Sequence, residues 1–182
     1  MDLTTANTKW QIIAKFGFIN ALLLIALNLI VYITNSQTSI GFLNSILIII
    51  IVISTSYLGI IACRKEYFNG FLTYGQGVGL GFFINLLACF VLSFYTYIFV
   101  VFIDPDFLNN ILIQSKKMMI ERGDSEEVIA TGMGWVKKFT TPFYFSLFAG
   151  LGNLFSSAIG ILLLAIFTRK EDPNSHYNSL NN

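Results

Sequence analysis

Four long stretches of this sequence contain no charged residue, and they constrain its fold more than any other feature. They cover residues 16–33, 40–63, 77–103 and 143–168. Because a helix rises 1.5 Å per residue, about 20 apolar residues cross the hydrocarbon core of a bilayer. Only 12% of the 182 residues are charged, whereas a typical soluble domain has about 25%. The sequence therefore predicts an all-α polytopic membrane protein with four transmembrane helices.

The charge balance and the reactive residues exclude several functional classes. Lysine and arginine exceed aspartate and glutamate by only one residue, so the basic surface of a nucleic-acid-binding protein is missing. Charged residues inside a span usually mark ion or proton pathways, and no span has one. A single histidine, His176, and two cysteines at different predicted depths, Cys63 and Cys89, offer neither a metal site nor a disulfide. We therefore expect a protein that is not an enzyme, with no catalytic, metal or cofactor site.

Basic residues near the ends of the spans predict the orientation in the membrane. Four spans place both termini on one side, which then carries Lys9, Lys15, Arg64, Lys65, Arg169 and Lys170. The opposite side has none in the first connection and five in the long connection. The positive-inside rule then places both termini in the cytoplasm. We expect the first span to be retained, because its 18 residues exceed the apolar core of about 7–15 residues in a signal peptide.

The long connection at 104–141 has helix signals of its own. Asp104 is predicted to cap a first helix that Gly123 ends. Asp124 and Glu127 have the spacing of a capping box for a second helix. Together they predict an amphipathic helical hairpin.

Trp135, Lys137 and Lys138 in this hairpin are residue types that anchor proteins at lipid headgroups. The hairpin is therefore predicted either to lie on the lipid surface or to dock a partner protein. The four spans and the hairpin form one predicted domain over residues 1–170, and the polar end at 171–182 is predicted to be a disordered cytoplasmic tail.

Small and weakly polar residues recur at helical spacing in two spans. In the third span they are Gly77, Gly81, Asn85, Cys89 and Ser93. In the fourth span they are Ser146, Ala149, Asn153, Ser156 and Gly160. Small residues let membrane helices approach closely, so these ten positions are predicted to be helix-packing sites. The glycines of "TYGQGVGLGFF" belong to this pattern, since no strand precedes them as a phosphate-binding loop requires.

Asn85 and Asn153 allow a second interpretation, in which they line a polar path through the bundle. Amide side chains in membrane bundles usually tie one helix to another by hydrogen bonds. A pocket at membrane depth that both asparagines reach would instead indicate a path for a solute.

Two stretches carry a family resemblance: "NGFLTYGQGVGLGFF" (69–83), which enters the third span, and "YTYIFVVFIDPDFLNN" (95–110), which leaves it. With "TTPFY" behind them, they resemble the bacterial domain-of-unknown-function family 4199. The resemblance implies a four-helix protein of the bacterial inner membrane. It implies no catalytic or binding residue.

Two functions are compatible with these observations. The first is a non-enzymatic assembly, scaffold or accessory component, whose partners are the lipid bilayer and either another membrane protein or a second copy of the chain. The alternative is a carrier or binding protein for a small uncharged solute or a lipid.

Overall fold

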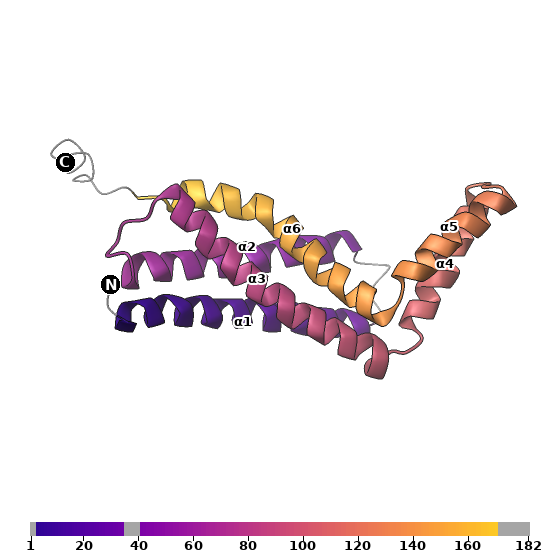
Figure 1. Cartoon of the computed structure of the whole chain (residues 1–182), viewed down its shortest axis with the longest axis horizontal. Coiled ribbons are helices and arrows are strands. Elements are labelled where there is room, and N and C mark those ends of the chain that lie inside the picture. The colour runs from indigo at the N-terminus through magenta and orange to yellow at the C-terminus, as the bar shows by residue number, and fades with distance from the viewer. Residues whose placement is uncertain (1–2, 35–40, 171–182) are drawn as a thin grey trace. The chain divides into compact units, whose positions relative to one another are not determined.

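A computed structural model describes residues 3–34 and 41–170, and these residues are almost entirely helical (Figure 1). The helices are α1 (Leu3–Ile33), α2 (Gly41–Glu66), α3 (Tyr74–Ile98), the π-helical segment η1 (Phe99–Ile103), α4 (Phe107–Glu121), α5 (Glu126–Phe139) and α6 (Pro142–Thr168). The predicted tail at 171–182 with His176, and residue 40 of the second predicted span, lie outside the described residues.

Four helical segments are long and apolar enough to cross a membrane: Thr8–Ile33, Phe42–Glu66, Tyr74–Ile103 and Pro142–Thr168. The predicted fold class is therefore confirmed. The first helix begins earlier than the predicted span because Lys9 and Lys15 do not interrupt it. Their ammonium groups lie 5.6 Å from the Trp10 ring centroid and 5.7 Å from the Phe16 ring centroid, respectively.

Large apolar side chains point away from the protein along these segments. The exposed fraction is 79% for Phe42, 73% for Phe155 and 82% for Phe167. Soluble proteins rarely expose continuous apolar surface of this kind. The chain is therefore a multi-pass membrane protein whose spans contact lipid.

The contacts within the chain define two compact units. The first consists of Met1–Val91 and Asn153–Asn182, and the second consists of Leu92–Gly152. The first unit thus contains α1, α2, the beginning of α3 and the end of α6. The single domain over residues 1–170 stays a prediction.

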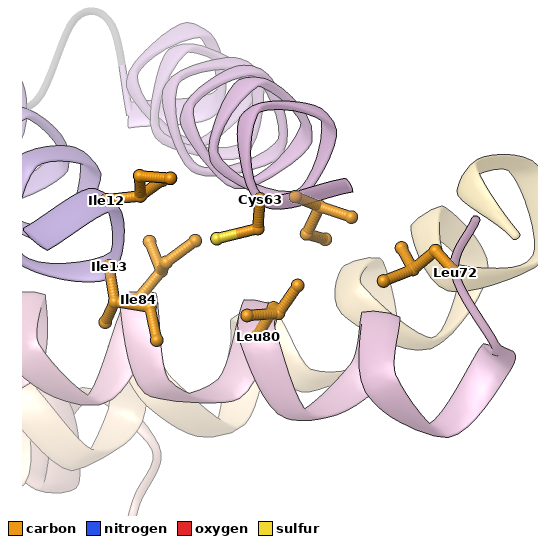
Figure 2. Packing of buried hydrophobic residues seen from close by; sticks show 7 residues of the cluster. Ile12, Ile13, Cys63, Leu72, Leu80 and Ile84 are labelled. Carbon is orange, nitrogen blue, oxygen red and sulfur yellow. The ribbon is translucent and has the colours of Figure 1, made fainter. Parts of the chain in front are cut away.

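The first unit has an apolar core where α1, α2 and α3 meet. Figure 2 shows Ile12, Cys63 and Ile84 pointing toward one another from these three helices. Ile13, Ile60, Leu72 and Leu80 complete this cluster of buried residues. Side chains that pack this closely fix the distance between the helices, because a buried residue has no free volume into which it can move.

Polar contacts tie the ends of three helices together in the same unit. The Arg64 guanidinium donates a hydrogen bond of 3.0 Å to the carbonyl oxygen of Thr168, at the end of α6. Leu72 and Lys170 form an antiparallel backbone bridge, with N–H···O distances of 2.7 and 2.8 Å. A cation at the C-terminus of a helix complements the helix dipole, so this arrangement stabilises the end of α6.

Aromatic rings hold the second unit together. Phe107 of α4 packs edge-to-face against Phe99 and against Phe145 of α6, each with ring centroids 5.7 Å apart. Phe139 of α5 packs in the same way against Phe148 of α6, at 5.9 Å. Such pairs add stability beyond their burial, and here they connect both hairpin helices to α6.

The predicted hairpin is present as α4 and α5, but the predicted caps are wrong. Asp104 does not cap α4, because the helix begins further along the chain; its N–H donates to the carbonyl oxygen of Phe99 at 2.9 Å, at the end of η1. The helix begins at Phe107, with Asp106 at the N-cap position and no side-chain cap. Gly123 does end α4, with φ of 80°.

Asp124 lies one residue before the N-cap of α5, and its N–H closes the end of α4 by donating to the carbonyl oxygen of Met119 at 3.2 Å. Together with the bond from Gly123 to Ile120, this pattern is a Schellman motif. Ser125 is the N-cap instead, and its hydroxyl accepts from the N–H of Val128.

Candidate functional site

Three polar side chains form a hydrogen-bonded chain in the centre of the first unit. Asn20 of α1 donates to the Asn85 side-chain oxygen of α3 at 3.1 Å, and Asn85 donates to the Ser56 hydroxyl of α2 at 2.8 Å. All three residues have 0% exposure. Burying a polar group without a hydrogen bond is costly in an apolar environment, so these bonds favour the observed packing of α1, α2 and α3.

The geometry also fixes the role of each group of Asn85. The Asn85 amide nitrogen also lies 2.8 Å from the carbonyl oxygen of Gly81. This carbonyl can only accept a hydrogen bond, so the atom that faces it must be the amide nitrogen. The Ser56 oxygen is therefore the acceptor of its bond with Asn85, and the hydroxyl hydrogen of Ser56 is not used in that bond.

Ser56 also lines a groove of about 300 Å³ between α2 and α6. Most of the groove is aliphatic, with Val52 and Ile53 on α2 and Leu164 on α6 among its lining residues. No charged side chain of the described residues lines it. Its size is at the lower end of the range of about 300–1,000 Å³ that small-molecule sites occupy.

The polar part of the groove consists of Ser56, Asn153, Ser156 and Ser157. The Ser157 hydroxyl already donates to the carbonyl oxygen of Leu154, at 2.7 Å. By contrast, the Asn153 side-chain oxygen is buried and has no hydrogen-bond partner among the described residues. An unpaired buried acceptor costs about 1–3 kcal/mol, and a ligand that donates to it would recover part of this free energy.

The groove lies near the middle of the two helices. Ser56 is ten residues from the end of α2 at Glu66, which corresponds to about 15 Å along a helix of about 39 Å. Asn153 lies eleven residues after the start of α6 at Pro142. The groove is thus at the depth of the lipid tails, where charged groups are strongly disfavoured.

The predicted packing residues of α3 mostly face inward. Gly77, Gly81, Asn85 and Cys89 are buried, and Ser93 is half-buried. A Cβ atom at Gly81 would lie only 2.7 Å from Cγ2 of Ile161 on α6, and one at Gly77 would lie 3.4 Å from Cβ of Ala165. These two glycines therefore sit where α3 and α6 approach each other closely.

The predicted packing residues of α6 do not share one environment. Ser146 is buried and its hydroxyl donates to the carbonyl oxygen of Phe143 in its own helix. Asn153 and Gly160 are half-buried, whereas Ala149 and Ser156 are exposed. The buried side of α6 also contains larger residues, among them Ile161.

Of the two asparagines predicted for a polar path, only Asn153 lines the groove, because the amide of Asn85 is engaged with Asn20, Ser56 and Gly81. The sequence analysis missed Ser56. Gly59, three residues further along α2, packs closely against Ile84, but the sequence alone does not show which helix this face of α2 contacts.

The described residues offer little for metal or redox chemistry. Within residues 3–34 and 41–170, no three histidine, cysteine, aspartate or glutamate side chains are grouped so that they can hold a metal ion. Cys63 and Cys89 are buried and form no disulfide.

The four apolar spans define an α-helical, multi-pass membrane protein with a groove between α2 and α6. Residues 15–170 match the family described as "Protein of unknown function (DUF4199)", and the chain belongs to this family. The resemblance found in the sequence is thereby confirmed. No curated protein and no solved structure matched the chain.

Proposed function

We propose that this chain is a non-enzymatic membrane protein that binds an uncharged, lipid-like molecule in the groove between α2 and α6. The observation that carries the proposal is the buried, unpartnered Asn153 oxygen within a groove that is mostly aliphatic. An apolar site with a few fixed polar groups is the usual design of a small-molecule pocket. The molecule enters from the bilayer, where a neutral lipid is already present.

This proposal favours the binding alternative over an assembly role. The exposed Ala149 and Ser156 of α6 are small residues of the type that membrane helices use to pack together, and a partner helix is the main competing occupant of the groove. A helix of a partner or of a second copy would cover Ser156 and the Asn153 oxygen together. Cross-links from the groove to a second chain would therefore indicate a helix partner in place of a lipid.

The proposed setting is the inner membrane of a bacterium, with both termini in the cytoplasm. The basic residues around α1, α2 and α6 support this orientation through the positive-inside rule. The membrane itself supplies the ligand, so no soluble partner is needed.

Photolabelling in lipid nanodiscs tests the proposal directly. The probe is a long-chain alcohol with a diazirine on its chain, and the labelled peptides are identified by mass spectrometry. We expect labels on α2 and α6 around Ile53, which lines the groove and is 37% exposed. Ile53→Trp should fill the groove and reduce this labelling severalfold.

Ile50→Trp is the matched control, because Ile50 is 53% exposed on the same helix and does not line the groove. It should leave the labelling of the groove unchanged. Equal loss of labelling in both variants, or cross-links from the groove to a second protein chain in place of the probe, would contradict the proposal.

A further inference from the structure

We infer that the ligand of the groove is a neutral lipid that carries a hydroxyl group, which accepts a hydrogen bond from Ser56 and donates one to Asn153. The inference rests on the proposed function and specifies the chemical class of the ligand. It follows from which donors and acceptors inside the groove already have partners and which do not.

Ser56 supplies the donor. Its oxygen accepts the hydrogen bond from Asn85 at 2.8 Å, and a hydroxyl has one hydrogen to donate in addition. No acceptor for this hydrogen is found among the described residues. Because Ser56 is 0% exposed and lines the groove, its free hydrogen is available to a ligand there.

Asn153 supplies the acceptor. Its side-chain oxygen is buried, lines the same groove and has no donor among the described residues. Ser157 does not compete for the ligand, since its hydroxyl hydrogen is engaged with Leu154 at 2.7 Å. The buried part of the groove thus offers an unused donor on Ser56 and an unused acceptor on Asn153, while the hydroxyl of the exposed Ser156 lines the groove as well.

The depth and the lining exclude charged headgroups. A phosphate or carboxylate would need a cation near it, and an ammonium would need an anion. The groove has neither among the described residues, and it lies at the depth where charges cost the most free energy. Phospholipid headgroups are therefore excluded, although their tails can contact the aliphatic part.

The remaining uncharged groups differ in whether they can hydrogen-bond to Ser56, to Asn153 or to both. An ester or ether oxygen only accepts, so it leaves the Asn153 oxygen without a donor. A hydrocarbon satisfies neither group. A hydroxyl is the smallest group that both donates and accepts, so it meets both needs within a site of about 300 Å³.

Asn85 and Asn20 act as positioning residues for this site. Asn85 holds the Ser56 oxygen as an acceptor, and Asn20 holds the Asn85 side-chain oxygen at 3.1 Å. Neither asparagine is among the residues that line the groove. Replacing Asn85 should free Ser56 to donate to its own helix backbone, as Ser157 does, and thereby weaken the recognition of the hydroxyl.

Competition against the diazirine alcohol tests the recognition of a hydroxyl group separately from the binding of a lipid chain. The competitors are hexadecanol, hexadecyl methyl ether, which only accepts, and hexadecane. A single hydrogen bond in a membrane protein corresponds to about threefold in affinity, so we expect hexadecanol to compete about threefold to tenfold better than the ether. Equal competition by all three would overturn the hydroxyl inference while leaving lipid binding intact.

Variants assign the preference to the two groups. Ser56→Ala and Asn153→Leu should each reduce the preference for the alcohol over the ether. Asn85→Leu should also reduce this preference, although residue 85 does not contact the ligand. Ser157→Ala is the matched control, because its hydroxyl is already engaged, and it should keep the full preference.

Loss of the preference in Ser157→Ala to the same extent, with unchanged preference in Ser56→Ala, would overturn the assignment. Absence of groove labelling in the native chain would overturn both the inference and the proposed function. Labelling by the probe with no competition by any of the three compounds would show nonspecific tail contact and would also contradict the inference.

Discussion

Three glycines of the spans are matched with large aliphatic residues on a neighbouring helix. A Cβ atom at Gly81 would meet Ile161, one at Gly59 would meet Ile84, and one at Gly17 would meet Leu87. The absence of a side chain on one helix therefore provides space for a bulky residue on the next. This complementarity produces close packing at native density without requiring two small faces.

Gly81→Ala should destabilise the first unit. The added Cβ atom would lie 2.7 Å from Cγ2 of Ile161, and a β-branched side chain has little freedom to rotate away. Overpacking of this kind costs about 1–3 kcal/mol, so we expect a lower unfolding temperature in detergent. A thiol-reactive dye reports unfolding conveniently, because Cys63 and Cys89 are buried.

Gly79→Ala provides the control for this experiment. No atom lies within 4 Å of a Cβ at Gly79, and alanine is a better helix former than glycine by about 1 kcal/mol. Its unfolding temperature should equal or exceed that of the native chain. The packing argument fails if Gly81→Ala unfolds at the same temperature as Gly79→Ala.

The same pairing explains why the packing face of α3 was easier to predict than that of α6. On α3 the small residues themselves face inward, as Gly77 and Gly81 do. On α6 their partners are Ile161 and Ala165, and a search for small residues alone does not find an isoleucine. Ser56 was missed for a related reason, since a serine within an apolar helix has no sequence signal that distinguishes an interhelical contact from a bond to its own backbone.

The helices of the hairpin were predicted, whereas their first residues were not. Helical periodicity depends on many positions and survives local changes, but a cap depends on one hydrogen bond. Asp104 and Asp124 are both used by the end of the preceding helix, through their backbone N–H groups. The local backbone geometry sets where each helix begins, and Asp106 and Ser125 occupy the N-cap positions.

One side of α5 carries three exposed apolar residues at helical spacing: Val128, Trp135 and Phe139. Trp135 stacks on Phe139, and the Lys138 ammonium lies 5.3 Å from the centroid of the Trp135 ring. Aromatic and basic residues together favour the headgroup region of a bilayer. We therefore predict that this side of the hairpin lies against lipid.

Fluorescence quenching by brominated lipids measures the depth of Trp135. In a Trp10→Phe background, Trp135 is the only tryptophan. Lipids brominated near the headgroup should quench its emission about twofold more strongly than lipids brominated deep in the tails, because an interfacial ring lies about 5–10 Å into the membrane. Emission that neither lipid quenches would contradict lipid contact and favour a protein partner at this surface.

The number of spans was the most predictable property of this chain, because a charge-free run of more than 20 residues has few alternatives to crossing a bilayer. The groove was not predictable from these runs. It depends on how α6 lies against α2. Gly160 of α6 and Ile53 of α2 contribute to this, because a Cβ atom at Gly160 would lie 3.5 Å from Cγ1 of Ile53. Such a contact reflects the packing of several helices, which no single span encodes.

The proposed orientation of the chain in the membrane rests on the four spans and the basic residues, and two acidic positions test it. Glu66 follows the second span and Glu127 lies between the third and the fourth, so the two are predicted to lie on opposite sides of the bilayer. Both side chains are exposed. Replacing either glutamate changes the orientation signal little, because acidic residues contribute little to the positive-inside rule.

With Cys63 and Cys89 replaced by alanine, Glu127→Cys should react with a membrane-impermeant maleimide in intact bacterial cells. Glu66→Cys should react only after lysis, since it adjoins the basic residues Arg64 and Lys65, which the positive-inside rule predicts to lie in the cytoplasm. The reverse pattern would show that the termini lie outside the cytoplasm. Labelling of both cysteines in intact cells would mean that the third span does not cross the bilayer, which would contradict the four-span architecture.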